Sequence, residues 1–241
     1  LSFSVESEEL VGLIVPYGAG KSTMFNILSG VFRPTSGEVL FCDEDITGHK
    51  PHQIAEKGLV RTFQETKLFM NLSVLKNVEI ACHIPAKVGG VRDILGTAFT
   101  RGKKHEFREE ALNIVRRVGL EKLKTERAME LPHGFQRGLA LAIALASRPK
   151  LLCLDEPVTG MNLEEVSFMT DLICKLRQEG TTILLVEHTM RVVMGICDKI
   201  VVLNFGKKIA EGTTEELREN EAVIEAYLGR QQQHVSRGER N

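Results

Sequence analysis

The chain has 241 residues, of which 43% are hydrophobic and 26% are charged. This composition is typical of a globular protein with a sizeable core, either one large domain or a core with a subdomain, and excludes a disordered chain. The formal net charge is -1, from 31 basic and 32 acidic residues. The chain therefore lacks the basic excess of proteins that bind nucleic acid through bulk charge. The five cysteines are scattered without a C-x-x-C pair, which favours reduced thiols over disulfides or a zinc site.

The N-terminal part of the chain is predicted to form a strand, a glycine-rich turn and a helix. Residues 10–15 are a short apolar run that stops at Pro16, and the glycines that follow lead into a helix that starts at Lys21 and ends near Ser29. Further along, the pattern predicts an edge strand, a short helix and another strand, at residues 37–41, 54–58 and 59–63.

The middle of the chain has a different pattern, which predicts mostly helix over residues 74–148. Residues 85–104 contain several glycines and are predicted to be a loop or a small insertion. Apolar residues then recur at helical spacing over 106–118, and Gly119 is the expected end of that helix. Residues 139–146 are apolar on every face, so we expect this helical segment to be fully buried.

After Pro149, apolar strands alternate with helices again. The predicted strands are 151–154, 181–186 and 199–203, and the predicted helices are 164–179, 189–197 and 215–228. Nearly continuous apolar strands that alternate with helices indicate an α/β fold, in which a mostly parallel sheet is covered on both faces. The last residues of the chain, from Gln231, are predicted to be a polar, frayed tail.

A glycine-rich segment with the chemistry of a phosphate cradle follows the first strand. Its sequence is Gly18-Ala19-Gly20-Lys21-Ser22-Thr23. In a P-loop, backbone N–H groups and a helix N-terminus face phosphate oxygens, the lysine reaches the β- and γ-phosphates, and the serine hydroxyl binds Mg²⁺. The alternative is an ordinary glycine-rich turn with a chance Lys-Ser pair. Val15 stands where the strict motif has its first glycine, which predicts a weaker cradle.

Further candidate site residues follow three of the predicted strands. Asp155 and Glu156 come directly after a buried strand, where open α/β sheets bind ligands. Asp155 suits Mg²⁺, and Glu156 is placed to polarise an attacking water in phosphoryl transfer; the alternative is a solvated loop with ordinary acids. His188 follows another strand and is a candidate γ-phosphate donor, although a lone histidine is more often structural. Gln64 also ends a strand, and its amide is a weaker candidate for metal or water.

Together these residues resemble the ATP-binding subunits of ABC transporters, over essentially the whole chain. Lys21 and Ser22 match the Walker A motif, Gln64 the Q-loop, Asp155 and Glu156 the Walker B motif with its catalytic glutamate, and His188 the H-loop. Residues 131–137 fall at the family's signature sequence and residues 158–162 at its D-loop. The resemblance implies a P-loop NTPase fold with a small antiparallel β part and an inserted helical subdomain. The implied division is an ATP-binding core at 1–67 and 149–214, a helical subdomain at 68–148, and a C-terminal helix and tail at 215–241.

Finer features are similar to one subfamily, the first of the two ATPases of the high-affinity branched-chain amino acid importers. These features are residues 61–64, the inserted segment at 85–104, residues 187–190 and 193–198, and the ending at 226–229. The ATPase of lipopolysaccharide export shares part of this ending and stays an alternative.

The resemblance also implies ligands, site residues and partners. Within one subunit, ATP would be bound by Tyr17, Gly18, Ala19, Gly20, Lys21, Ser22 and Thr23, and in a sandwich dimer the other subunit would contribute Leu131 and Gly134. Mg²⁺ would be bound by Ser22, Gln64 and Asp155. The catalytic residues would be Glu156, His188 and Gln64. The implied partners are a second ATP-binding subunit, transmembrane permease subunits and, indirectly, a periplasmic solute-binding protein, with no nucleic acid. No apolar run reaches the roughly 20 residues of a membrane-spanning helix, and the resemblance implies a peripheral place on the cytoplasmic face of the membrane.

Several departures from the family pattern fall in or next to its functional motifs. They are Val15 and Tyr17 in the cradle, Pro132 and Phe135 in the signature, Ala140 and Ile143 in the next helix, and Leu163 after the D-loop. None removes Lys21, Asp155, Glu156 or His188, so we expect weaker ATP binding than in the family with the reacting groups retained. A transport motor and a nucleotide-compromised assembly subunit both stay open. A soluble ATPase acting on DNA or ribosomes would have a coiled-coil insertion or tandem cassettes, which this chain lacks.

Overall fold

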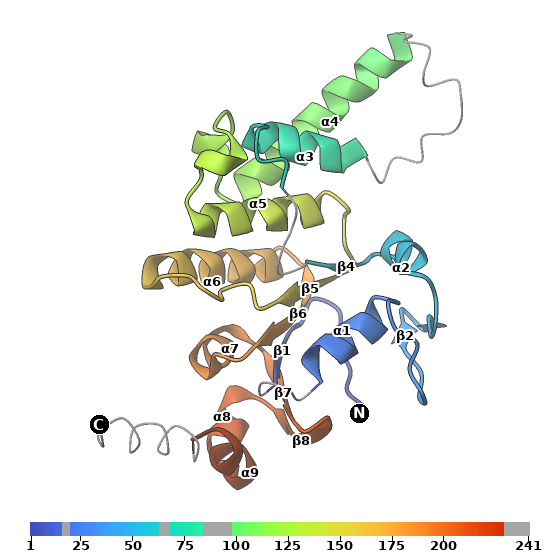
Figure 1. Ribbon diagram of the computed structural model, residues 1–241, viewed down its shortest axis with the longest axis vertical. Helices are drawn as coiled ribbons and strands as arrows, with labels where there is room; N and C mark the ends of the chain where they lie inside the picture. Colours follow the sequence, from blue (N-terminus) through green and yellow to red (C-terminus); the bar gives the residue numbers. More distant parts are fainter. Residues whose placement is uncertain (16–19, 63–67, 84–97, 229–241) are drawn as a thin grey trace. The chain divides into compact units, whose positions relative to one another are not determined.

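The computed structural model describes residues 1–15, 20–62, 68–83 and 98–228 (Figure 1). The described chain forms two compact units. The first comprises the described residues of 1–51, 153–156 and 177–228, and the second comprises the described residues of 52–152 and 157–176. The predicted domain limits stay a prediction, and the predicted polar tail lies outside the described residues.

The first unit is built on a sheet whose middle strand is β1 (Leu10–Ile14). β1 pairs in parallel with β6 (Thr182–Glu187) on one side and with β7 (Lys199–Asn204) on the other (Figure 1). All five residues of β1 and all six of β6 are buried, as expected for strands that are covered on both faces. At the end of β5 (Leu151–Asp155), the Glu156 N–H donates to the Val186 carbonyl oxygen at 2.9 Å. The carboxyl ends of β5 and β6 therefore lie side by side.

An antiparallel edge strand, β8 (Lys207–Gly212), completes this part of the sheet and was not predicted. It pairs with β7 through a turn in which Phe205 and Gly206 both have positive φ, 44° and 74°. Two such residues form the tight hairpin turn whose twist matches that of the strands. The sequence of β8, Lys-Lys-Ile-Ala-Glu-Gly, is half polar and lies at the edge of the sheet, so it lacks the apolar run by which the other strands were recognised.

Two further predictions for this unit need correction. The edge strand predicted at 37–41 begins only at Leu40: β2 (Leu40–Phe41) forms a small antiparallel pair with β3 (Glu44–Asp45). The single helix predicted at 215–228 is instead three pieces, α8 (Thr214–Arg218), α9 (Glu221–Val223) and the π-helical turn η4 (Ile224–Leu228). The break occurs at Asn220, because its side-chain oxygen accepts the N–H groups of Ala222 and Val223 and so starts a new helix.

The second unit is mainly helical. Helix α3 (Val74–His83) packs against α4 (Ala98–Arg117) and α5 (His133–Leu145) (Figure 1). Two 3-10 helices, η2 (Glu121–Leu123) and η3 (Ala128–Glu130), connect α4 to α5. The remaining elements are α2 (Pro51–Lys57), β4 (Leu59–Arg61) and α6 (Leu163–Gln178), whose last two residues belong to the first unit.

The helical predictions for this unit are largely confirmed. Residues 139–146 are all buried except Ile143, which is half-buried, and Gly119 follows α4 with φ 76°. The predicted loop was too long, because α4 already begins at Ala98; the segment 98–104 contains good helix formers, and a helix tolerates the single Gly102. Residues 84–97 lie outside the described part. Within the residues that the structure describes, no helix is both long and apolar enough to cross a bilayer.

Candidate functional site

Lys21 lies between two nearly buried carboxylates in the first unit. It is the first residue of α1 (Lys21–Leu28). Its ammonium group forms an ion pair with Glu156 Oε1 and is 3.9 Å from Asp155 Oδ1. The side chains of Asp155 and Glu156 are only 8% and 6% exposed, and that of Lys21 is 20% exposed. Buried carboxylates need a cation nearby, and here Lys21 supplies it.

His188 joins the same cluster from the end of β6. Its Nδ1 is 3.4 Å from Glu156 Oε1 and 3.8 Å from Glu187 Oε2. The structure therefore brings together four of the predicted site residues, Lys21, Asp155, Glu156 and His188, from the ends of two neighbouring strands and the start of one helix. This is the arrangement expected when ligands bind at the carboxyl ends of parallel strands.

Glu187 is a further member of this cluster, and no role was predicted for it from the sequence. It is the last residue of β6, its side chain is fully buried, and its Oε2 accepts the His188 N–H at 3.3 Å. The signal was present, because an acid at the end of an apolar strand is the same pattern that singled out Asp155. This hydrogen bond is to the backbone of His188, while the imidazole Nδ1 stays 3.8 Å from the Glu187 carboxylate.

The backbone at Glu156 is unusual and is held in place by the sheet. Its φ is 48°, in the left-handed region that residues other than glycine rarely adopt. The hydrogen bond from its N–H to Val186 keeps the residue there. Backbone strain that is fixed by surrounding structure is concentrated at functional sites, and here it aims the carboxylate at Lys21.

The start of α1 is not covered by other described parts of the chain. Gly20 precedes the helix with φ 95°, and apart from its chain neighbours and the helix backbone, no described residue has an atom within 4 Å of the position that a Cβ would take there. The first turn, Lys21–Thr23, carries no acidic residue, and Ser22 and Thr23 are exposed. The first N–H groups of this helix are therefore suited to an anion. Of the predicted nucleotide and metal ligands, Tyr17, Gly18, Ala19 and Gln64 lie outside the described residues, and their roles stay predictions.

The predicted signature residues lie in the second unit, at the start of α5. Leu131 is buried, and its carbonyl oxygen accepts from Gln136 Nε2 at 2.9 Å. The Gly134 N–H donates to Glu165 Oε1 at 2.7 Å. This hydrogen bond is the main reason why the pKa of the Glu165 carboxyl is lowered, and the Asn162 N–H adds to the effect. Glu165 could not be predicted as a site residue from the sequence, because 31 positions separate it from Gly134.

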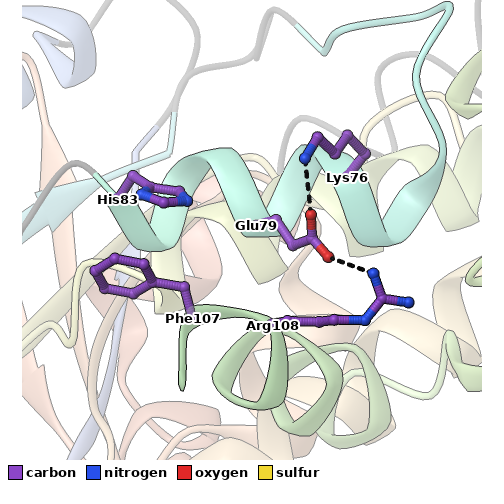
Figure 2. A pocket seen from close by; sticks show the side chains of 5 residues that line it. All are labelled: Lys76, Glu79, His83, Phe107 and Arg108. Carbon is purple, nitrogen blue, oxygen red and sulfur yellow. Dashed lines mark hydrogen bonds and ion pairs between the residues drawn. The ribbon is translucent and has the colours of Figure 1, made fainter. Parts of the chain in front are cut away.

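A pocket of about 170 Å³ lies between α3 and α4 in the second unit (Figure 2). The carboxylate of Glu79 is at its centre, 2.9 Å from Lys76 Nζ and 3.4 Å from an Arg108 nitrogen. Beside it, the rings of His83 and Phe107 lie 4.3 Å apart. None of the predicted site residues lines this pocket. The Arg108–Glu79 ion pair joins the two helices, whereas the Lys76–Glu79 pair lies within α3.

Comparison with known proteins assigns the chain to a family. The family model described as ABC transporter matches residues 1–159, and the model described as branched-chain amino acid ATP-binding cassette transporter matches residues 207–232. The chain is 42% identical over 223 residues to the high-affinity branched-chain amino acid transport ATP-binding protein LivG of Escherichia coli strain K12. The match covers 92% of this chain and 88% of that protein.

Two solved structures are similar to this chain over most of its length. One is the ADP conformation of an ATP-binding cassette of an ABC transporter, with a TM-score of 0.79, 27% identity, and coverage of 95% of this chain and 91% of that one. The other is a dimeric post-hydrolysis state of an ATP-binding cassette bound to ADP and phosphate, with a TM-score of 0.70, 25% identity, and coverage of 88% of each chain. These matches confirm the predicted P-loop NTPase fold. With the Lys21–Glu156 cluster in place, the chain belongs to the ATP-binding subunits of ABC transporters.

Proposed function

We propose that the chain binds and hydrolyses ATP to power an importer of branched-chain amino acids. The observation that carries the proposal is the convergence of Lys21, Glu156 and His188 at one edge of the sheet, next to an open helix start. The substrate class rests on the LivG relative and on the family match at residues 207–232. That match favours an amino acid importer over a lipopolysaccharide exporter.

Nucleotide binding would use the first turn of α1. The N–H groups after Gly20 and the ammonium group of Lys21 would face the phosphates, and Tyr17, Gly18 and Ala19 would complete the cradle. Lys21 is now paired with Glu156, so a triphosphate would exchange this ion pair for a lysine–phosphate contact. The exchange releases the Glu156 carboxylate for its own role.

The residues present fit Mg²⁺ as the accompanying cation. Asp155 offers a carboxylate and Ser22 a hydroxyl, which are the hard oxygen ligands that this ion prefers, and Gln64 would add an amide oxygen. Among the described residues no three His, Cys, Asp or Glu side chains gather closely enough to hold a metal. Phosphate and water oxygens would therefore complete the coordination, as is usual for Mg²⁺ at phosphate sites. When bound, the ion would neutralise charge on the phosphates.

Hydrolysis would then depend on Glu156 and His188. The Glu156 carboxylate would take a proton from a water molecule whose oxygen attacks the γ-phosphorus, while the bond to the β–γ bridging oxygen breaks to give ADP and phosphate. His188, whose Nδ1 is 3.4 Å from Glu156, would keep the carboxylate in position and donate to the γ-phosphate.

The partners follow from family membership. A second ATP-binding subunit would supply Leu131 and Gly134 to the nucleotide, so that ATP stabilises a closed dimer. Permease subunits at the cytoplasmic face of the membrane would convert closure into transport, and a periplasmic solute-binding protein would deliver the amino acid. We propose no nucleic-acid partner.

Steady-state phosphate release with Mg·ATP tests the proposal. We expect turnover by the wild-type chain and a loss of about 100-fold or more in Glu156→Gln, because general base catalysis contributes on that scale. Glu38→Gln, a change of the same kind at an exposed glutamate, should retain wild-type turnover. Wild-type release no faster than that of Glu156→Gln would contradict hydrolysis and favour a nucleotide-compromised assembly subunit. Co-purification with the permease, followed by leucine uptake in vesicles, tests the substrate class.

A further inference from the structure

The side chain of Glu165 connects the starts of two helices in the second unit. Its Oε1 accepts the Gly134 N–H at 2.7 Å, at the second residue of α5. Its Oε2 accepts the Asn162 N–H at 3.1 Å, just before α6, and the Glu165 N–H donates back to Asn162 Oδ1 at 3.0 Å. The pair with Asn162 is a reciprocal capping box. The hydrogen bond to Gly134 is not part of this cap, because it joins Glu165 of α6 to the start of α5.

The contact with Gly134 leaves no room for a side chain there. A Cβ built on Gly134 would lie 2.8 Å from Glu165 Cγ and 3.0 Å from its Cβ. Glu165 therefore passes directly over the start of α5, and the glycine permits this approach. The carboxylate is also placed favourably for charge, because it lies at the positive ends of two helices at once.

We infer that Glu165 is a positioning residue that fastens the signature loop, residues 131–137, to the D-loop, residues 158–162. A single carboxylate holds one N–H group from each side. The two loops then move as one body, and Gly134 is presented in a fixed direction when ATP closes the dimer. This inference rests on the proposed function, because it assigns Glu165 to the dimer-forming step of that ATPase.

The test measures ATP-driven dimerisation separately from ATP binding. Dimerisation is followed by analytical ultracentrifugation in the slowly hydrolysing Glu156→Gln background, with Glu165→Ala or Glu165→Gln added. We expect Glu165→Ala to raise the ATP concentration for half-maximal dimer formation roughly tenfold, as expected for the loss of charge-assisted hydrogen bonds. Glu165→Gln should have an intermediate effect, because its one amide oxygen cannot accept both N–H groups in the same geometry.

Two controls separate positioning from a general structural role. Binding of a fluorescent ATP analogue to the monomer should stay within about twofold of the parent, since a tenfold change is the size of effect attributed to Glu165. Glu164→Gln changes the neighbouring glutamate, which is exposed, and should leave dimerisation as in the parent. The nearly isosteric Glu165→Gln variant keeps the volume of the side chain, so it serves as the comparison if Glu165→Ala unfolds.

The possible outcomes are distinct. Unchanged ATP dependence of dimerisation in both Glu165 variants would overturn the inference. Tighter dimerisation would also overturn it, and would mean that the carboxylate competes with phosphate for the Gly134 N–H. A parent protein that neither dimerises with ATP nor, with Glu156 restored, hydrolyses it would refute the proposed function itself.

Discussion

The starts of α1 and α5 differ in what occupies them, although both are glycine-containing helix N-termini in the same chain. Gly20 precedes α1 with φ 95°, and apart from its chain neighbours and the helix backbone, no described residue lies within 4 Å of its Cβ position. Gly134, the second residue of α5, faces the side chain of Glu165 at contact distance. The first glycine is required by its backbone conformation and the second by steric space. A helix start that is open can receive a ligand from solution, whereas one that holds a carboxylate of its own chain is already committed to an internal contact.

The chemistry differs in the same way. At α1, the side chain of Lys21 pairs with Glu156, and both belong to a cluster with Asp155 and His188 that is mostly buried. At α5, a half-buried carboxylate holds backbone N–H groups. The first set contains groups that can react, and the second contains groups that can only orient.

Lys21→Ala should have the largest effect. The change removes the cation beside Asp155 and Glu156 and the group proposed to bind phosphate. We expect turnover to be abolished and ATP affinity to fall by about 100-fold, since charge-assisted contacts to phosphate are lost. The nucleotide-free protein should also lose roughly 3 kcal/mol of unfolding free energy, because two nearly buried carboxylates lose their cation.

Phosphate release, nucleotide titration and urea unfolding check these three expectations. Lys207→Ala, at an exposed lysine of β8, is the matched control. An unchanged ATP affinity in Lys21→Ala would mean that the nucleotide binds elsewhere. The start of α1 would then not be the ligand-binding helix start that we contrast with α5.

His188→Ala should reduce turnover by about 100-fold, at the lower end of the range for a group that assists proton transfer. ATP binding should change little, because Lys21 and the start of α1 are untouched. The measurement is kcat and KM for phosphate release, with direct nucleotide titration beside it. A rise in KM at unchanged kcat would show that His188 serves ATP binding. It would contradict the assignment of His188 to the groups that take part in the reaction.

Gly134→Ala should have a smaller effect, and it addresses the second helix start directly. The added methyl group would lie 2.8 Å from Glu165 Cγ, so the Glu165 side chain must move. We expect a loss of about 1–3 kcal/mol of unfolding free energy, the usual cost of overpacking, together with weaker ATP-driven dimerisation. Gly20→Ala is the informative comparison: space is open there, so its cost of roughly 1 kcal/mol would come from the backbone conformation alone.

The regions that the sequence predicts well are those whose signals are local. β1, α1 and β5 were predicted because apolar runs and turn residues mark their ends, and Asp155 and Glu156 were placed because parallel strands bring their carboxyl ends to one edge of the sheet. β8 was missed because its sequence is half polar.

The residues that were missed make contacts that sequence spacing does not reveal. Glu165 reaches Gly134 from 31 positions away, and no pattern along the chain relates the two. Glu187 was different, because its position at the end of an apolar strand was visible and only its contact with His188 was not. Orienting groups are therefore harder to find from sequence than reacting groups, which follow strand ends and motifs.

Val15→Gly should have the smallest effect on function. It tests whether the residue that precedes the predicted phosphate-binding loop limits ATP binding at the start of α1. Val15 is 3% exposed and follows β1, where the strict phosphate-binding motif has glycine. A β-branched side chain restricts the backbone at that position, so its removal should tighten ATP binding by a few-fold, about 1 kcal/mol in the scale of such backbone effects. The same change empties a buried site, and the unfolding free energy should fall by about 2 kcal/mol.

Val15→Ala separates the two consequences, because it removes most of the bulk without giving glycine's backbone freedom. Tighter binding in Val15→Gly alone would assign the effect to the backbone, tighter binding in both would assign it to bulk, and unchanged affinity in both would show that Val15 does not weaken the cradle.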